Sequence, residues 1–333
     1  MMMRPKKELD CEAGRAVQKR IQRIAADRSE NLHHVAQRYV LERFMSRVFA
    51  DREDMARSLH VLPGTGIGLN PSAITLKGGM TMTFAEQLPP LDGRSTGDVD
   101  LHLTAFEGSM EDFAAILRRV LAGPPETGPD DGVRFDIDEI HVARDKEERS
   151  GGTISIGCQV GVFPMKIKTD CTFDARPMDE RAEVRSYPSV IPDLDLGPLH
   201  VRCVPWEFML ADKFSAAVQL GDRNYRIRDY ADMRVVLGRE PSLVDEDFLV
   251  ETIAATLRFK GLDIPSSIHE LPAFSEAFAL AKESRWTHER VNKNYAVSET
   301  LVEMLAWLRD RWEPLVERVS RIDEVPGWAF GKP

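Results

Sequence analysis

The hydrophobic pattern of the first fifty residues predicts two helices, over residues 12–27 and 32–50. In the second segment, apolar side chains recur three and four positions apart, as they do on the packed face of a helix. These side chains are Val35, Tyr39, Leu41, Phe44, Met45, Val48 and Phe49. Glycine and proline in residues 62–68 then end the helical pattern.

Strand-like patterns fill most of the middle of the chain. The predicted elements there are a short strand at 73–76, a brief helix through residue 84, a strand with alternating polarity near residue 100, a helix at 111–121, strands at 133–137, 139–143, 153–162 and 164–173, and a short strand near 201–204. From residue 205 on, the pattern is mainly helical, with interruptions near Pro241, Pro265 and Pro272.

This order of elements predicts an α+β fold: a small mixed sheet with flanking helices, followed by a helical C-terminal region. The chain has 333 residues, more than one typical domain. We therefore expect a core over residues 1–204 and a helical region over residues 205–333.

Composition narrows the class of protein. With 43% hydrophobic and 29% charged residues, the chain is typical of a soluble globular protein. It has no apolar run long enough for a membrane helix and no apolar segment typical of a secretion signal near its start. The four cysteines, Cys11, Cys158, Cys171 and Cys203, are widely spaced, which favours reduced thiols in the cytoplasm.

The net charge of −10 means that any nucleic-acid partner needs a local basic surface. One candidate surface is the first helix, with Arg15, Lys19, Arg20 and Arg23 at helical spacing. A second set, late in the chain, comprises Arg285, Arg290, Lys293, Arg309, Arg311, Arg318 and Arg321. Taken singly, each set is more typical of a solvated helix face.

The strongest chemical signal is a pair of acids behind a pair of glycines. Because side chains alternate along a strand, Asp98, Asp100 and His102 share one face, with the two carboxylates about 7 Å apart. Such a pair can hold divalent cations. The glycines Gly78 and Gly79 can form a turn whose N–H groups point at phosphate oxygens.

A third acid follows in the strand predicted at 164–173. Alternation places Lys166, Lys168, Asp170 and Thr172 on one face. Either this is a solvated strand face, or Asp170 lies on a strand beside Asp98 and Asp100 and completes a metal site. Asp174, on the same face, is the fallback for the third acid.

The helical region contributes a lysine and a further acid. In the predicted helix at 206–220, Lys213 falls in an apolar stripe, where an ammonium either extends to water or binds an anion such as phosphate. Farther on, Asp229 shares a helix face with Asp232. Nearby arginines, Arg223, Arg226 and Arg228, can pair with these acids or reach a nucleotide.

Four motifs occur in an order that resembles one known family. They are Leu76-Lys77-Gly78-Gly79, Arg94-Ser95-Thr96-Gly97-Asp98-Val99-Asp100-Leu101, Glu207 with Ala211-Asp212-Lys213, and Arg228-Asp229-Tyr230-Ala231-Asp232. Over residues 30–237 the chain is similar to the AbiEii/AbiGii toxin family of nucleotidyltransferases. One departure is Met80, where that family commonly has a small polar residue, and we expect it to alter loop packing more than chemistry.

The resemblance implies a DNA polymerase β-like nucleotidyltransferase core with helical additions. It implies that Asp98, Asp100 and Asp170 bind Mg²⁺, and that Asp98, Asp100, Lys213 and Asp229 are catalytic. It also assigns nucleotide binding to Lys77, Gly78, Gly79, Arg94, Thr96 and Lys213.

The resemblance further implies a biological role. Characterised relatives are toxins of toxin–antitoxin and abortive-infection systems that attach nucleoside monophosphates to tRNA 3′ ends and stop translation. The expected partners are an NTP, a tRNA and an antitoxin that is a separate DNA-binding repressor, often without stable contact to the toxin. Two alternatives stay open: a small-molecule or protein acceptor for the same chemistry, and a scaffold without activity.

Overall fold

The structure is a computed structural model, and it describes residues 11–50, 60–70, 73–83, 97–104, 106–125, 129–144, 151–173, 181–197, 199–239, 242–293 and 297–322. The chain divides into two compact units. Unit 1 contains residues 1–86, 95–174 and 184–203, and unit 2 contains residues 87–94, 175–183 and 204–333.

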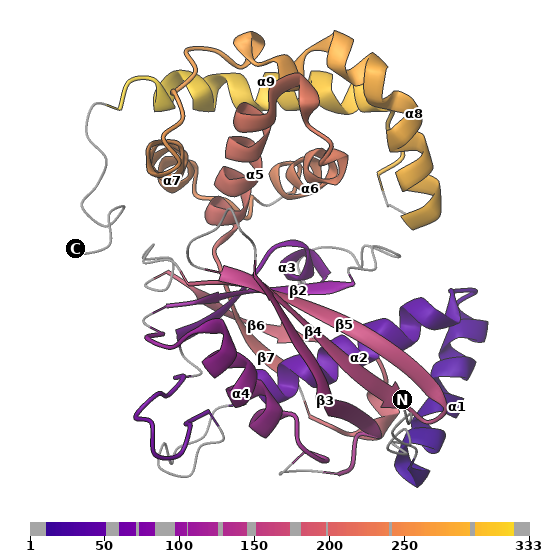
Figure 1. The fold of residues 1–333 in the computed structure, drawn as a ribbon. Helices are drawn as coiled ribbons and strands as arrows, with labels where there is room; N and C mark the ends of the chain where they lie inside the picture. Colours follow the sequence, from indigo (N-terminus) through magenta and orange to yellow (C-terminus); the bar gives the residue numbers. More distant parts are fainter. Residues whose placement is uncertain are drawn as a thin grey trace, which may run out of the picture. The chain divides into compact units, whose positions relative to one another are not determined.

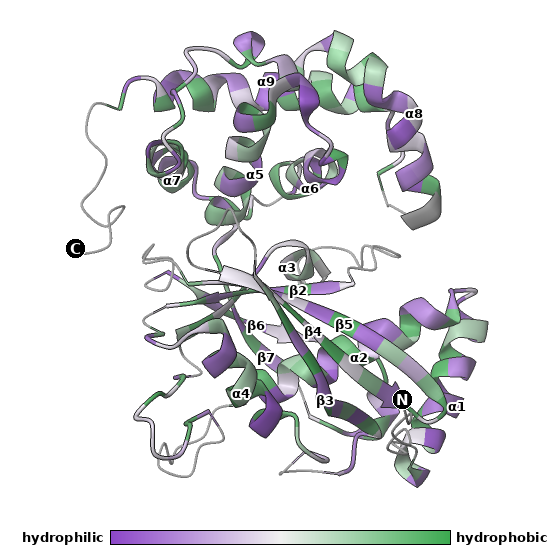
Figure 2. Ribbon diagram, in the orientation of Figure 1, coloured by the Kyte–Doolittle hydropathy of each residue, from purple (hydrophilic) through white to green (hydrophobic). Residues whose placement is uncertain are grey.

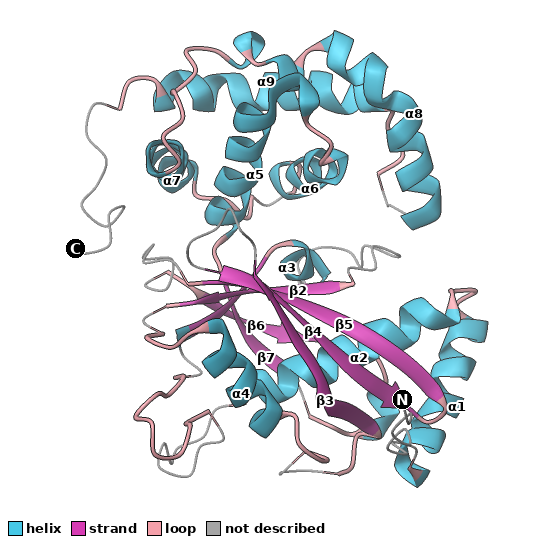
Figure 3. Ribbon diagram, viewed as in Figure 1, coloured by secondary structure: helices cyan, strands magenta, loops and turns pink. Residues whose placement is uncertain are grey.

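A mixed sheet of seven strands forms the centre of unit 1 (Figures 1 and 3). Its order is β3-β4-β5-β2-β1-β7-β6, with β2 parallel to β5 and β1 parallel to β7. The strands are β1 (Ile74–Lys77), β2 (Asp98–Leu103), β3 (Val133–Arg144), β4 (Gly151–Val160), β5 (Phe163–Thr172), β6 (Glu183–Tyr187) and β7 (Leu199–Cys203). The predicted mixed sheet with flanking helices is therefore confirmed.

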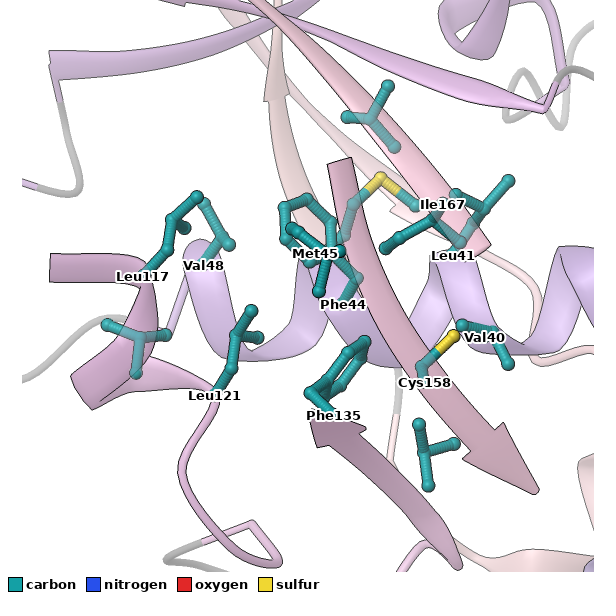
Figure 4. Packing of buried hydrophobic residues seen from close by; sticks show 14 of the residues in the cluster. Val40, Leu41, Phe44, Met45, Val48, Leu117, Leu121, Phe135, Cys158 and Ile167 are labelled. Carbon is teal, nitrogen blue, oxygen red and sulfur yellow. The ribbon is translucent and has the colours of Figure 1, made fainter. Parts of the chain in front are cut away.

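Helices cover one face of this sheet. They are α1 (Glu12–Asp27), α2 (Leu32–Val48) and α4 (Met110–Val120), while the short α3 (Gly79–Thr83) packs against β1 and β2. Figure 4 shows Phe44 and Met45 of α2 among side chains of α4 and the strands, including Phe135 and Ile167. Because the opposite face of β4 and β5 carries polar side chains, the sheet has one apolar and one polar face.

Unit 2 is helical, as expected from the pattern after residue 205. Its helices are α5 (Trp206–Leu220), α6 (Ile227–Leu237), α7 (Glu246–Phe259), α8 (Glu276–Lys293) and α9 (Leu301–Val319). Figure 2 shows α5 as hydrophobic along most of its length, and α7 and α6 pack against it. Phe214 of α5 stacks on Trp312 of α9, with ring centroids 4.6 Å apart.

Two elements differ from the predictions. The expected strands at 133–137 and 139–143 form the single strand β3, whose pairing with β4 shifts between Asp136 and Ile140. The bulge interrupts the alternation that the prediction relied on, so one strand gives two patterns. Strand β6 was not predicted, because Glu183-Val184-Arg185 is charged and occupies an edge of the sheet, where tertiary pairing rather than hydrophobic alternation sets the conformation.

Candidate active site

A row of polar residues crosses the polar face of the sheet in unit 1. Lys77 of β1 is the Cα partner of Asp100 in β2, and Asp100 is the Cα partner of Asp170 in β5. Asp170 is in turn the partner of Thr153 in β4. The expected position of Asp170, on a strand beside the first two acids, is therefore observed. Neighbouring strands lie about 4.8 Å apart, so the side chains of this row lie close together.

Two hydroxyl groups hold members of this row in place. The hydroxyl of Thr153 donates a hydrogen bond to Oδ1 of Asp170 over 2.5 Å. The ammonium of Lys77 donates to the hydroxyl of Thr172 over 2.5 Å. Since both side chains are half-buried, these bonds restrict the rotamers of Asp170 and Lys77 while leaving them in contact with water.

Gly78 follows β1 and contacts the carboxylate of Asp100. Its φ of +69° lies in the left-handed region, and Gly79 begins α3 immediately after it. A Cβ added at Gly78 would lie 1.9 Å from Oδ2 of Asp100 and 2.6 Å from its Cγ. Both the backbone conformation and the space occupied by Asp100 therefore require glycine at this position.

Asp98 begins β2 and is exposed, while Asp100 and Asp170 are half-buried. The alternation expected for β2 holds for Val99, Leu101 and Leu103, which are buried. His102, by contrast, is fully buried although it shares the face of the acids. It therefore does not extend the accessible row of acids.

Three predicted residues lie outside the residues that the structure describes: Arg94, Thr96 and Asp174. Asp170 is described and Asp174 is not, so the choice between them as the third acid stays a prediction. Met80, the departure from the family pattern, is buried in the core of unit 1.

The donor set suits a hard divalent cation. Carboxylate oxygens on adjacent strands are ligands that Mg²⁺ prefers. Within the described ranges, no group of three His, Cys, Asp or Glu side chains is close enough to form a complete protein cage. Mg²⁺ sites, however, usually combine one or two carboxylates with water and substrate phosphates, and the paired carboxylates of Asp100 and Asp170 suit such an ion.

The cysteines do not contribute to a metal site in the described part of the chain. Burial raises the pKa of the Cys158 thiol to about 12 and that of the Cys171 thiol to about 12. Both thiols are therefore protonated at physiological pH, and all four cysteines are free rather than in disulfides.

A second charged cluster lies within unit 2. The ammonium of Lys213 on α5 donates to Oδ1 of Asp229 over 2.7 Å and to Oδ2 of Asp232 over 2.6 Å, both on α6. Asp229 Oδ2 also lies 2.7 Å from Nε of Arg226. The side chain of Lys213 is only 6% exposed, so its charge is balanced inside the protein by two carboxylates.

Of the two outcomes expected for Lys213, contact with an anion is the one observed, and the anions are carboxylates of the protein. The pattern on α5 could not identify them, because it carries no information about α6. The observed partners are acids sixteen and nineteen residues later in the chain. Asp232 is thus a member of the cluster. The sequence placed it on the same helix face as Asp229 but assigned it no role.

Glu207, in the first turn of α5, is a buried acid with a structural partner. Its carboxylate accepts a hydrogen bond from the backbone N–H of Asp245 over 2.8 Å. Burial raises the pKa of Glu207 above its ordinary value. The group therefore joins the start of α5 to the N-cap of α7.

The two predicted basic sets have different environments. On α1, Arg15 and Lys19 are exposed, whereas Arg23 pairs with Asp193 over 2.8 Å. In the late set, most arginines are engaged within unit 2. These contacts are Arg285 with Glu289, Arg290 with the carbonyl of Ser298, Arg309 with the carbonyl of Phe274, Arg311 with Glu246, Arg318 with Glu246 and Asp247, and Arg321 with Glu317.

Sequence reasoning missed Thr153, and it placed Thr172 on the face of Asp170 without predicting its contact with Lys77. Alternation in β4 and β5 puts both hydroxyls on the polar face, so the pattern alone indicates on which side of the sheet they lie. Which acid or lysine each one contacts depends on the strand order and register, which the pattern does not contain.

No helix among the described residues is long and apolar enough to span a membrane.

Comparisons with known proteins place the chain in a family. The family described as nucleotidyl transferase AbiEii toxin, type IV TA system, matches residues 68–315, a range that begins and ends later than the resemblance noted above. No curated protein matches the chain in sequence.

Solved structures with a similar fold include MenT4, a nucleotidyltransferase toxin from Mycobacterium tuberculosis H37Rv. It is 13% identical, with a TM-score of 0.55, and the match covers 94% of this chain and 92% of that one. JHP933 from Helicobacter pylori is 12% identical with a TM-score of 0.47, covering 87% of this chain and 95% of that one. The family match spans most of the sequence, and the chain therefore belongs to the AbiEii family of nucleotidyltransferase toxins of type IV toxin–antitoxin systems.

Proposed function

We propose that the protein transfers a nucleoside monophosphate from an NTP to a hydroxyl of RNA, with the tRNA 3′ end as acceptor. The acceptor oxygen forms a bond to the α-phosphorus, and the bond between that phosphorus and the bridging oxygen breaks. Pyrophosphate leaves with the electron pair, and the hydroxyl proton passes to a carboxylate. The observation that carries the proposal is the pairing of Asp100 with Asp170 beside Gly78.

The acids of unit 1 have separate roles in this proposal. Asp98, Asp100 and Asp170 would hold Mg²⁺, and the bound ion would neutralise phosphate charge and favour departure of pyrophosphate. Oδ1 of Asp170 accepts the Thr153 hydroxyl, and Oδ2 is the oxygen that accepts the proton of the attacking hydroxyl. Thr153 is a positioning residue, because it acts through Asp170.

Gly78, Gly79 and Lys77 serve the triphosphate. The left-handed turn at Gly78 allows the chain to pass from β1 into α3 directly beside Asp100. Lys77, held by Thr172, supplies a positive charge in the same row as the acids. We assign to Arg94 and Thr96 the nucleotide-binding roles that family membership suggests.

Lys213 is the proposed phosphate ligand of unit 2. An ammonium has three N–H donors, and Asp229 and Asp232 accept two of them. We propose that the third donor binds a phosphate oxygen. Asp229 is essential in this account because it holds both Lys213 and Arg226.

RNA is the proposed acceptor because the chain belongs to a family of toxins, and translation depends on tRNA ends. The net charge of −10 favours a second candidate, a small molecule or protein hydroxyl as acceptor. We also propose that the toxin acts in the cytoplasm and that a separately folded antitoxin, a DNA-binding repressor, counteracts it.

The test incubates the protein with each α-labelled NTP, Mg²⁺ and total tRNA. Label in the RNA that is lost with a chelator and restored by Mg²⁺ is the expected result. Label on a protein or small molecule, but not on RNA with any of the four NTPs, would identify the second candidate instead. Rate measurements at increasing salt separate the two, because RNA binding weakens steeply with ionic strength.

A further inference from the structure

Unit 2 displays an exposed aromatic side chain between cations, immediately before the helix that carries Asp229. Tyr225 is 59% exposed, in the turn that links the short 3₁₀ helix Gly221–Arg223 to α6. Arg223 and Arg226 lie on either side of it in sequence, and both are exposed. A tyrosine ring this exposed is accessible to a planar ligand, on which it can stack.

The turn that presents Tyr225 is anchored on both sides. Asn224 is buried, its side chain donates to the hydroxyl of Tyr230 over 2.9 Å, and its carbonyl oxygen accepts from the N–H of Arg226 over 2.9 Å. The hydroxyl of Tyr230 donates to the carbonyl of Ala273. The backbone on each side of Tyr225 is therefore held before any ligand arrives, which lowers the entropy cost of binding.

The same segment is locally basic in an acidic protein. Residues 221–228 contain three arginines and one aspartate, so their net charge is +3 − 1 = +2, against −10 for the chain. Arg226 pairs with Asp229 and Arg228 with Glu289, yet their side chains stay 49% and 48% exposed. Their guanidinium groups thus remain accessible to a further anion.

An aromatic face between guanidinium groups is suited to an unpaired nucleotide. Bases of single-stranded RNA stack on tyrosine and arginine, while arginine binds the phosphates. The observed contacts also link this segment to the Lys213 cluster, since Arg226 contacts Asp229 and Asp229 contacts Lys213. A strand bound at Tyr225 would accordingly lie beside the cluster proposed to hold nucleotide phosphate.

We infer that Tyr225 is a stacking platform for an unpaired base of the acceptor RNA, with Arg223 and Arg226 as ligands of its phosphates. This inference rests on the proposed function, because it names a contact of the same RNA substrate. The 59% exposure of Tyr225 favours an RNA strand over the base of a single NTP, which an enzyme usually encloses.

The experiment compares the full-length protein with Tyr225→Ala and Tyr225→Phe. Two measurements are made on each: KM values for RNA and for NTP in the labelling assay, and binding of a short fluorescent single-stranded RNA by anisotropy without NTP. Phe259→Ala is the matched control, because Phe259 is 52% exposed and lies between Arg258 and Lys260. Thermal unfolding of all variants monitors the fold.

Tyr225→Ala is expected to weaken RNA binding and raise the RNA KM about tenfold or more. Tyr225→Phe and Phe259→Ala should stay within about twofold of the wild type, with the NTP KM unchanged in all three. In addition, Arg223→Gln should reduce the slope of log Kd against log salt by about 1. These results together support the platform.

Several outcomes would overturn the inference. If the wild type labels RNA and Tyr225→Ala has an unchanged RNA KM, the platform is wrong and the proposed function stands. A rise in the NTP KM alone would show that the base of the NTP occupies this surface instead. If the wild type binds RNA through Tyr225 but transfers no label to it, the proposed acceptor is wrong, and Tyr225 binds RNA without being a platform for the acceptor.

Discussion

Replacement of Gly78 by alanine tests how closely the glycine turn and Asp100 depend on each other. A Cβ at this position would lie 1.9 Å from Oδ2 of Asp100, whereas ordinary contact begins at 3.4 Å. Relief of the overlap requires the two groups to separate by 3.4 − 1.9 = 1.5 Å. The backbone of Gly78, at φ +69°, is held between β1 and α3, so the carboxylate of Asp100 is the group that moves.

The two consequences of this substitution have different sizes. An alanine in the left-handed region costs roughly 1–2 kcal/mol of stability. Displacement of a reacting group by about 1 Å can cost about 100-fold in rate. Because Asp100 must move farther than that, we expect kcat/KM to fall by at least about 100-fold, beyond the loss that partial unfolding explains.

Gly66→Ala is the matched control. Gly66 has a φ of +72° in the same unit, but a Cβ there meets nothing within 4 Å. The control should therefore lose a similar amount of stability and keep its activity. Label transfer and thermal unfolding are measured for both variants, and nearly wild-type transfer by Gly78→Ala would refute the argument.

Three further predictions follow from single contacts. Thr153→Val removes the hydrogen bond to Asp170 and should lower kcat about tenfold, with Thr153→Ser close to wild type in the same kinetic assay. Lys213→Ala removes the buried ammonium from Asp229 and Asp232, although Asp229 keeps Arg226, and should cost about 3–5 kcal/mol in urea unfolding, with partial recovery when Asp232→Asn is added. Full stability of the single variant would contradict the cluster. Burial raises the folded-state pKa of Glu207, so its contribution to stability is complete below its ordinary pKa of 4.5 and is lost as pH rises through the folded value. Glu207→Gln should therefore be more stable than wild type by on the order of 1 kcal/mol at pH 8, with the gain disappearing near pH 4.

The sequence predicted the strand faces of the acids better than their partners. Alternation alone places Asp98 and Asp100 on one strand face, because the period of a strand is fixed by backbone geometry. It also put Asp170 on a polar face, and strand pairing then brought that residue beside Asp100. Strand order is a property of the whole fold, so the Thr153 contact could not be predicted.

The partners of Lys213 in the helical unit could not be predicted from the sequence either. The pattern of α5 identified Lys213 as a misfit and the pattern of α6 placed Asp229 and Asp232 on one face. That the two faces meet depends on how α5 and α6 pack. The approach of the glycine turn to phosphate stays a prediction, and the structure adds two reasons for glycine at position 78: the left-handed backbone and the carboxylate of Asp100.

The most direct test of the account is transfer of α-labelled NMP to total tRNA by the wild type and by Asp100→Asn. Asparagine keeps the shape of Asp100 against Gly78 but removes the negative charge, so folding is preserved while the metal-binding acid is lost. The account predicts strong, Mg²⁺-dependent label in tRNA for the wild type and a loss of at least about 100-fold in the variant. Equal labelling of tRNA by both proteins would contradict it.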